Sequence, residues 1–225
     1  MTELKTPVIV VNFKTYGEVE GAKALEVARA CQEVSEETGR SIVVCPPTVE
    51  LSSVAANLKV PVFCQHVDAK NRGANTGWVT PQGVLSAGAV GTLLNHSEHR
   101  LMMYDLKASI EACKEAGLIT IACADSPETA AIIASFKPDF IAIEPPELIG
   151  GNVSVTDARP EVISKGVEAV HAVSPEIPVL CGAGIKTGMD VKKAMELGAA
   201  GVLLASGVVK SKDVKATLKD LVSRI

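Results

Sequence analysis

The chain has 225 residues, of which 47% are hydrophobic, 21% charged and only 3% aromatic, and its formal net charge at pH 7 is −4. So much apolar material can form a sizeable core, which excludes an intrinsically disordered chain. A mildly acidic chain with few aromatic side chains has neither the positive field nor the stacking platforms of a nucleic-acid-binding protein. Its charge also gives it no attraction to an anionic membrane.

Three further features of the sequence bear on location. The longest nearly apolar stretch, residues 197–209, is shorter than a membrane-spanning helix, which needs about 20 residues. The N-terminal segment lacks the long apolar region of a signal peptide. The six cysteines include no Cys-x-x-Cys pair and several lie in apolar runs, so we expect reduced core thiols in a cytoplasmic protein.

Short apolar runs recur along the chain, and helical periodicity fills the intervals between them. Continuous apolar runs predict parallel strands that are covered on both faces. Between them, Met102, Leu106, Ile110 and Cys113 recur at helical spacing and predict a helix with one apolar face. The eight predicted strands are, in chain order, Val8–Val11, Ser41–Cys45, Val60–Cys64, Val90–Leu94, Ile119–Cys123, Phe140–Ile143, Pro178–Cys181 and Gly201–Leu204.

Two of the later helices carry explicit start signals. Ser126 followed by Pro127 is typical of an N-cap residue and a proline in the first turn, and Thr187 with Asp190 resembles a capping box. The chain therefore reads as a regular alternation of strands and helices from its first strand to its last.

Eight strands alternating with helices are compatible with a closed (β/α)8 barrel of parallel strands and with an open doubly wound sheet. The open sheet favours a glycine-rich turn after the first strand, but residues 12–15 read NFKT. Glycine-rich turns instead follow the seventh and eighth strands, at 182–184 and 205–207, where closed barrels often bind phosphate. The sequence therefore predicts a closed barrel and, since no linker interrupts it, a single domain over residues 1–225.

Polar side chains stand where three of the predicted strands end. Lys14 follows the first strand, His96 the fourth and Glu144 the sixth. In a barrel the carboxyl ends of all strands meet at one face, so we expect these three side chains to line a common mouth. Together they would supply a fixed cation, an electrophile and a general base.

Each of these residues also has a simpler interpretation when it is taken alone. Lys14 could be a surface charge, His96 a structural histidine at a helix start, and Glu144 a solvated loop residue. A metal site on His96, Glu98 and His99 is a further alternative. A catalytic zinc needs three protein ligands, and no third histidine, cysteine pair or carboxylate cluster lies close in sequence, so we expect no metal.

Taken in order, the motifs resemble the triosephosphate isomerase family over nearly the whole chain, from residue 12 to about residue 208. Asn95 stands where the family usually has glycine, His99 replaces a usual arginine, and the usual tryptophan of the lid is absent; these departures resemble the compact archaeal branch of the family. The matching motifs are Asn12-x-Lys14, His96-Ser97-Glu98, Glu144 with the lid segment 145–151 after it, and the two late glycine-rich turns.

The resemblance implies an isomerase of glycolysis and gluconeogenesis that interconverts dihydroxyacetone phosphate and D-glyceraldehyde 3-phosphate through an enediolate, without a cofactor. Glu144 would move the proton, His96 would polarise the carbonyl as a neutral imidazole at a helix start, and Lys14 would supply positive charge. Glu98 would lie behind the groups that touch the substrate. The residues implied in substrate binding are Asn12, Phe13, Lys14, Ile149, Gly150, Gly184, Ala205 and Ser206.

The resemblance also implies a homodimer or a homotetramer in which the loop around Thr76, residues 73–77, docks against a neighbouring subunit. Two other functions stay open at this point. One is an aldolase on the same barrel, in which Lys14 forms a Schiff base, and the other is a non-catalytic sugar-phosphate-binding protein. Borohydride trapping would reveal the Schiff base, whereas pure binding would not need Lys14, His96 and Glu144 together.

Overall fold

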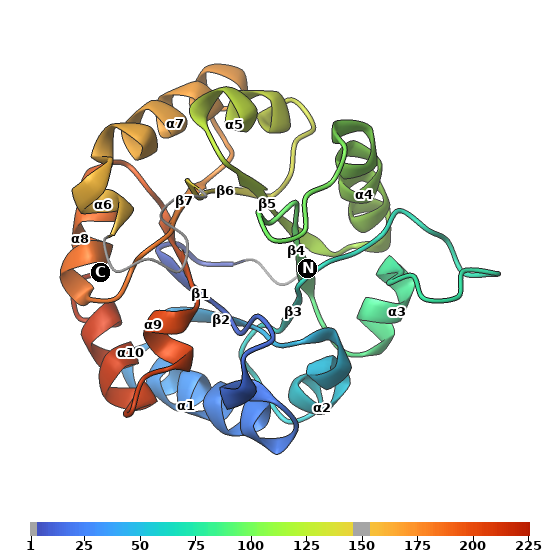
Figure 1. Ribbon diagram of the computed structural model, residues 1–225, viewed down its shortest axis with the longest axis horizontal. Helices are drawn as coiled ribbons and strands as arrows, with labels where there is room; N and C mark the ends of the chain where they lie inside the picture. Colours follow the sequence, from blue (N-terminus) through green and yellow to red (C-terminus); the bar gives the residue numbers. More distant parts are fainter. Residues whose placement is uncertain (1–3, 146–153) are drawn as a thin grey trace.

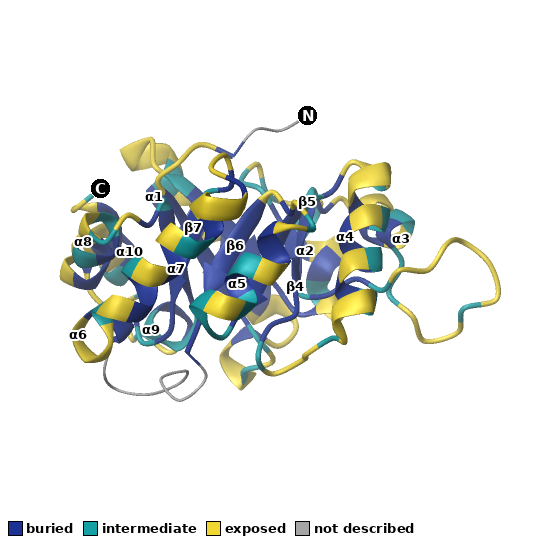
Figure 2. Cartoon of the chain, turned by 90° about the horizontal axis from the view of Figure 1, so that it is seen from above, coloured by how far each residue is buried: buried dark blue, intermediate teal, exposed yellow. Residues whose placement is uncertain are grey.

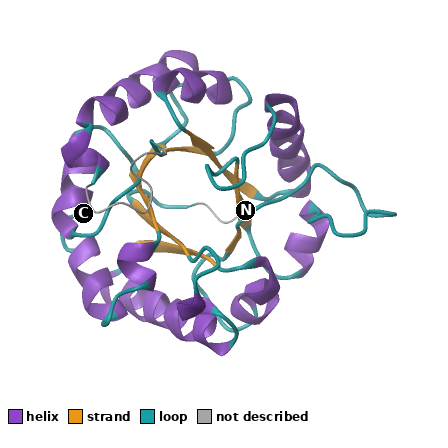
Figure 3. Cartoon of the chain, viewed as in Figure 1, coloured by secondary structure: helices purple, strands orange, loops and turns teal. Residues whose placement is uncertain are grey.

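The structure is a computed structural model that describes residues 4–145 and 154–225. A ring of parallel strands forms its centre and helices surround the ring, as Figures 1 and 3 show. Each observed strand lies within or close to a predicted one, because each apolar run is covered on both faces. The strands are β1 (Val8–Asn12), β2 (Ser41–Cys45), β3 (Phe63–Cys64), β4 (Gly91–Leu94), β5 (Ile119–Ala124), β6 (Phe140–Ile143), β7 (Val179–Gly182) and β8 (Gly201–Leu204).

The ring of strands is nearly closed. Hydrogen-bonded neighbours follow the order β2-β1-β8-β7-β6-β5-β4-β3. The two ends of this order, β2 and β3, are joined among the described residues by one isolated parallel bridge, between Val44 and Val62. The predicted strand at 60–64 is reduced to Phe63–Cys64, which begins two residues after Pro61, a residue with no N–H to donate to a ladder. The result is consistent with a (β/α)8 barrel that has a small seam.

Helices form the outer layer, and both predicted capping signals are confirmed. Ser126 accepts a hydrogen bond from the backbone N–H of Thr129, and Thr187 and Asp190 form a capping box. The described helices are α1 (Ala22–Thr38), α2 (Leu51–Ala55), α3 (Pro81–Ser86), α4 (Met103–Ala116), α5 (Pro127–Ala134), α6 (Val155–Ala158), α7 (Pro160–Val173), α8 (Gly188–Glu196), α9 (Ser206–Val209) and α10 (Val214–Val222), with 3-10 turns η1 (Gly17–Val19) and η2 (Thr48–Glu50).

The prediction for the apolar face of α4 is wrong at one residue. The periodicity predicts Met102 beside Leu106 on the buried side of the helix, but Met102 lies before the first turn of α4 and is 66% exposed. The remaining members, Leu106, Ile110 and Cys113, are buried as expected. The spacing is therefore helical, but the helix begins one residue later than the periodicity indicates.

Successive residues of each strand alternate between two cores. In β1, Val8 and Val10 pack among the other strands inside the ring, whereas Ile9 and Val11 pack against the helices. This follows from the two-residue period of a strand. Because both sets are apolar, the strands are held rigidly, and the polar residues that follow them at their carboxyl ends are positioned by that rigid scaffold.

A long loop between β3 and α3 projects away from the barrel (Figures 1 and 2). Its residues 69–78, which we call the β3–α3 loop, are exposed apart from the half-buried Asn75. Trp78, 53% exposed, ends this stretch, and the Lys70 ammonium lies 4.7 Å from the centroid of its ring. Within the described part of the chain, no helix is long and apolar enough to cross a bilayer.

Candidate active site

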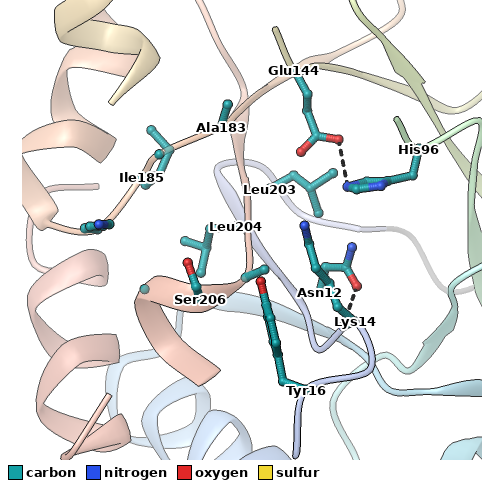
Figure 4. Close-up of a pocket in the computed structure, with 14 residues that line it drawn as sticks. Asn12, Lys14, Tyr16, His96, Glu144, Ala183, Ile185, Leu203, Leu204 and Ser206 are labelled. Carbon is teal, nitrogen blue, oxygen red and sulfur yellow. Dashed lines mark hydrogen bonds and ion pairs between the residues drawn. The ribbon is translucent and has the colours of Figure 1, made fainter. Parts of the chain in front are cut away.

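The carboxyl ends of the strands bring the predicted polar residues into one pocket (Figure 4). Lys14 follows the end of β1, His96 lies in the segment after β4, and Glu144 directly follows β6. The turns after β7 and β8 form the facing wall. Residues that line the pocket and that the sequence predicts as substrate-binding or catalytic are Asn12, Lys14, His96, Glu144, Gly184, Ala205 and Ser206.

The carboxylate of Glu144 is almost completely enclosed, with the residue only 5% exposed. Its position depends on Gly182 at the end of β7, because a Cβ there would lie 2.3 Å from Glu144 Cγ. Burial raises the pKa of Glu144, and His96, Cys123 and Lys14 act in the opposite direction without cancelling that effect. A buried carboxylate with a raised pKa has the properties of a general base.

His96 lies in a turn, so its predicted place at a helix start is wrong. The next helix, α4, begins only at Met103, so His96 is not part of its first turn. The backbone N–H of Glu98 instead donates to His96 Nδ1 at 3.2 Å. Because an accepting Nδ1 carries no proton, the ring is neutral with its proton on Nε2, which lies 3.4 Å from Glu144 Oε2. His96 can therefore donate a hydrogen bond into the pocket.

Lys14 combines a strained backbone with a nearly buried side chain. Its φ of 50° is in the left-handed region that non-glycine residues rarely adopt. Asn12 Oδ1 accepts from the Lys14 N–H at 2.9 Å, and Gln65 Nε2 donates to the Lys14 carbonyl oxygen at 2.9 Å. Lys14 Nζ donates to Glu98 Oε1 at 2.7 Å, and Glu98 Oε2 lies 3.7 Å from His96 Nδ1. Glu98, whose side chain is 55% exposed, thus supports both residues from the outer side.

The wall opposite these side chains consists mainly of backbone. Gly184, Ala205 and Ser206 line it, and the two turns lie so close together that a Cβ on Gly207 would be 2.9 Å from the carbonyl oxygen of Ile185. Helix α9 begins at Ser206. The N–H groups of Val208 and Val209 donate to the Ala205 carbonyl oxygen, which leaves those of Ser206 and Gly207 at the start of the helix as donors that face the pocket. The wall therefore presents hydrogen-bond donors of the kind that suit an anion.

The remaining predicted substrate-binding residues are Phe13, Ile149 and Gly150. Phe13 is fully buried in the core, its N–H donates to the Cys45 carbonyl oxygen at 3.0 Å, and it is not among the residues that line the pocket. Ile149 and Gly150, with the rest of the predicted lid after Pro145, lie outside the described residues. Their predicted contacts with a substrate stay predictions.

Three residues with polar side chains at the site have no counterpart among the predicted site residues. Tyr16 and Lys186 line the pocket, and Gln65 holds the Lys14 carbonyl. Tyr16 follows Lys14 by two residues and Lys186 follows Gly184 by two, so their position in loops after predicted strands is a signal that could have found them. Gln65 also directly follows a predicted strand, but its contact joins residues 51 positions apart, which no local pattern shows.

Comparisons with known proteins identify relatives of this chain. The family model described as triosephosphate isomerase matches residues 7–222. The triosephosphate isomerase of Methanobacterium bryantii is 46% identical over 226 residues, covering 100% of both chains, and that of Methanosarcina barkeri is 49% identical over 219 residues, covering 97% of this chain and 99% of the relative.

Among solved structures, the crystal structure of triosephosphate isomerase from Bartonella henselae superposes with a TM-score of 0.75 at 20% identity, covering 96% of this chain and 98% of that one. At this identity the likeness shows the fold. The family itself is shown by the match over almost the whole chain and by the two methanogen relatives. The chain belongs to the triosephosphate isomerase family.

Proposed function

We propose that this chain interconverts dihydroxyacetone phosphate and D-glyceraldehyde 3-phosphate through an enediolate intermediate. The observation that carries the proposal is the meeting of Glu144, His96 and Lys14 in one pocket, with Glu144 Oε2 only 3.4 Å from His96 Nε2. Membership of the triosephosphate isomerase family supports the same reaction.

The reaction needs one base that takes a proton from the carbon next to the carbonyl and returns it to the adjacent carbon. Glu144 is that base: its raised pKa makes it able to hold the proton between the two steps. The Nε2–H of neutral His96 donates to the carbonyl oxygen as negative charge develops there, and the Lys14 ammonium stabilises the enediolate electrostatically. Asn12 orients Lys14 through its backbone N–H.

The phosphate group lies, in this proposal, against the backbone wall of the pocket. Gly184, Ala205 and Ser206 offer N–H donors there, and glycine at 207 lets the two turns approach each other. The lid residues Ile149 or Gly150 would close over the phosphate, an assignment that rests on the sequence resemblance. A closed lid would exclude water from the enediolate.

The contacts of Lys14 favour a fixed cation over a Schiff-base nucleophile. Imine formation needs a neutral amine, whereas Lys14 Nζ donates to the Glu98 carboxylate at 2.7 Å, a contact that stabilises the ammonium form. This observation supports the isomerase over the aldolase alternative on the same barrel.

A coupled assay tests the proposal directly. Purified protein is given D-glyceraldehyde 3-phosphate, and the dihydroxyacetone phosphate formed is reduced by an NADH-dependent glycerol phosphate dehydrogenase. We expect rapid NADH oxidation and, in a parallel incubation with borohydride, no mass increase on Lys14. A protein without activity, or one that borohydride and substrate label at Lys14, would contradict the proposal.

We further propose that residues 1–225 act as one domain with a functionally closed barrel, and that the chain forms a homodimer or a homotetramer in the cytoplasm. The exposed β3–α3 loop, which includes the exposed Thr76 and a half-exposed Trp78, supports docking against a neighbouring subunit. The six cysteines are all free and buried, which supports a reducing compartment.

A further inference from the structure

The wall of the pocket next to Asn12 and Lys14 carries a tyrosine to which the mechanism above gives no role. Tyr16 is half-buried, lies immediately before η1, and accepts a hydrogen bond from the Val19 N–H at 3.0 Å through its carbonyl oxygen. Its ring packs against the main apolar core. These contacts hold the ring in place, so the position of its hydroxyl is set by the fold.

The face of the Tyr16 ring is covered by a cation from the far end of the chain. Lys210 Nζ, at the end of α9, lies 4.2 Å from the ring centroid. An ammonium at this distance is attracted by the π-electron density and restrains the ring further. It also adds positive charge beside a pocket that Lys14 and Lys186 already line.

The hydroxyl of Tyr16 points into the pocket on the side of Ser206, and Asn12 and Lys14 lie between it and the pair formed by His96 and Glu144 (Figure 4). It therefore faces the part of the pocket formed by the backbone wall and not the part where the proton is moved. A tyrosine hydroxyl can donate one hydrogen bond, and a phosphate dianion has only acceptors. A hydrogen bond to a charged acceptor is shorter and stronger than a neutral one.

We propose that the Tyr16 hydroxyl is a binding residue for the substrate's phosphate group, donating to a phosphate oxygen opposite Ser206, with Lys210 holding the ring in place. The inference rests on the proposed function, because it takes the anionic end of the substrate to lie against the wall at Ala205 and Ser206. The Tyr16 hydroxyl would add a side-chain hydrogen-bond donor to the backbone N–H groups that this wall presents.

The chain offers a matched control, since it contains only two tyrosines. Tyr16→Phe removes the hydroxyl and keeps the ring under Lys210. Tyr104→Phe removes the same atom from a residue on α4 that is 72% exposed. Each variant is compared with the unaltered chain for KM and kcat with D-glyceraldehyde 3-phosphate, and for competitive inhibition by inorganic phosphate.

We expect Tyr16→Phe to raise KM by about tenfold or more, the usual cost of losing a hydrogen bond to a charged group. The inhibition constant for inorganic phosphate should rise by a similar factor while kcat stays nearly constant, because the contact is made equally in the ground and transition states. Tyr104→Phe should match the unaltered chain in all three quantities.

Two results would overturn the inference: Tyr16→Phe and Tyr104→Phe giving the same KM and phosphate inhibition, or a fall in kcat with phosphate inhibition unchanged. If the unaltered chain has no isomerase activity, the proposed function fails, but the inference is still decided separately. Calorimetric titration of the same proteins with inorganic phosphate then shows whether Tyr16→Phe alone weakens binding, and equal affinities would reject the contact.

Discussion

Replacing Glu144 by glutamine should remove activity and stabilise the protein at the same time. The side chain belongs to a residue only 5% exposed, and within the described part of the structure its Oε2 has no hydrogen-bond partner. The carboxamide has nearly the same shape but accepts no proton and carries no charge. Loss of a general base costs about 10²–10⁴-fold in rate, so we expect kcat to fall by at least that order.

The effect on stability follows from the raised pKa of Glu144, which burial causes. A folded-state pKa above the unfolded value means that the folded state holds the proton more tightly. The favourable contribution of Glu144 to the free energy of unfolding is fully present below about pH 4.5, the unperturbed pKa of a glutamate. It is lost as the pH rises through the pKa of Glu144 in the folded state. At pH 8, well above the unperturbed value, the carboxylate is ionised in the unfolded chain while burial opposes its ionisation in the folded one, and glutamine removes that penalty.

Differential scanning calorimetry at pH 4.5 and pH 8 measures this difference, with the coupled assay run on the same samples. We expect the Tm of Glu144→Gln to exceed that of the unaltered chain at pH 8 and the gap to shrink at pH 4.5, and each kcal/mol regained raises Tm by about 2–4 °C. Glu111→Gln, whose side chain is 61% exposed, is the matched control and should change neither quantity appreciably. A Glu144→Gln protein that keeps half its activity, or that is less stable at pH 8, would refute the reasoning.

The remaining predictions concern neighbouring parts of the same scaffold. Gly182→Ala should lower kcat by about 10²-fold, because the new Cβ displaces the Glu144 carboxylate; Gly17→Ala, which meets no atom within 4 Å, is the control, and equal rates for the two variants would contradict the steric argument. Lys14→Met should raise KM and lower kcat together in the coupled assay, and unaltered kinetics would make Lys14 a purely structural residue. The six buried thiols should react with Ellman's reagent only after denaturation, since burial raises the pKa of several of them; rapid labelling of the native protein would argue against this core. Deleting residues 71–76 from the β3–α3 loop should reduce the oligomer to monomers in light scattering, and an unchanged mass would place the interface elsewhere.

Local patterns were enough to predict where the strands lie and which residues end them. A buried parallel strand must be apolar on both faces, so it stands out as a continuous run, and the chain can become polar again only where the strand leaves the core. That is why Lys14, His96 and Glu144 are recognisable from the sequence. Where the pattern was interrupted, as at Pro61, the sequence overestimated the strand, and it placed Met102 inside a helix that begins after it.

The sequence by itself therefore determined the alternation of strands and helices, and with it the common face on which the polar strand ends meet. Only the tertiary structure decided how those residues act on one another. The tautomer of His96 depends on a backbone N–H in a turn, the space for Glu144 depends on the missing side chain of Gly182, and Tyr16 meets Lys210 across almost the whole chain. The last two of these contacts join elements that are remote in sequence, and the first depends on the geometry of one turn. Neither the two-residue period of a strand nor the helical period of its neighbours predicts them.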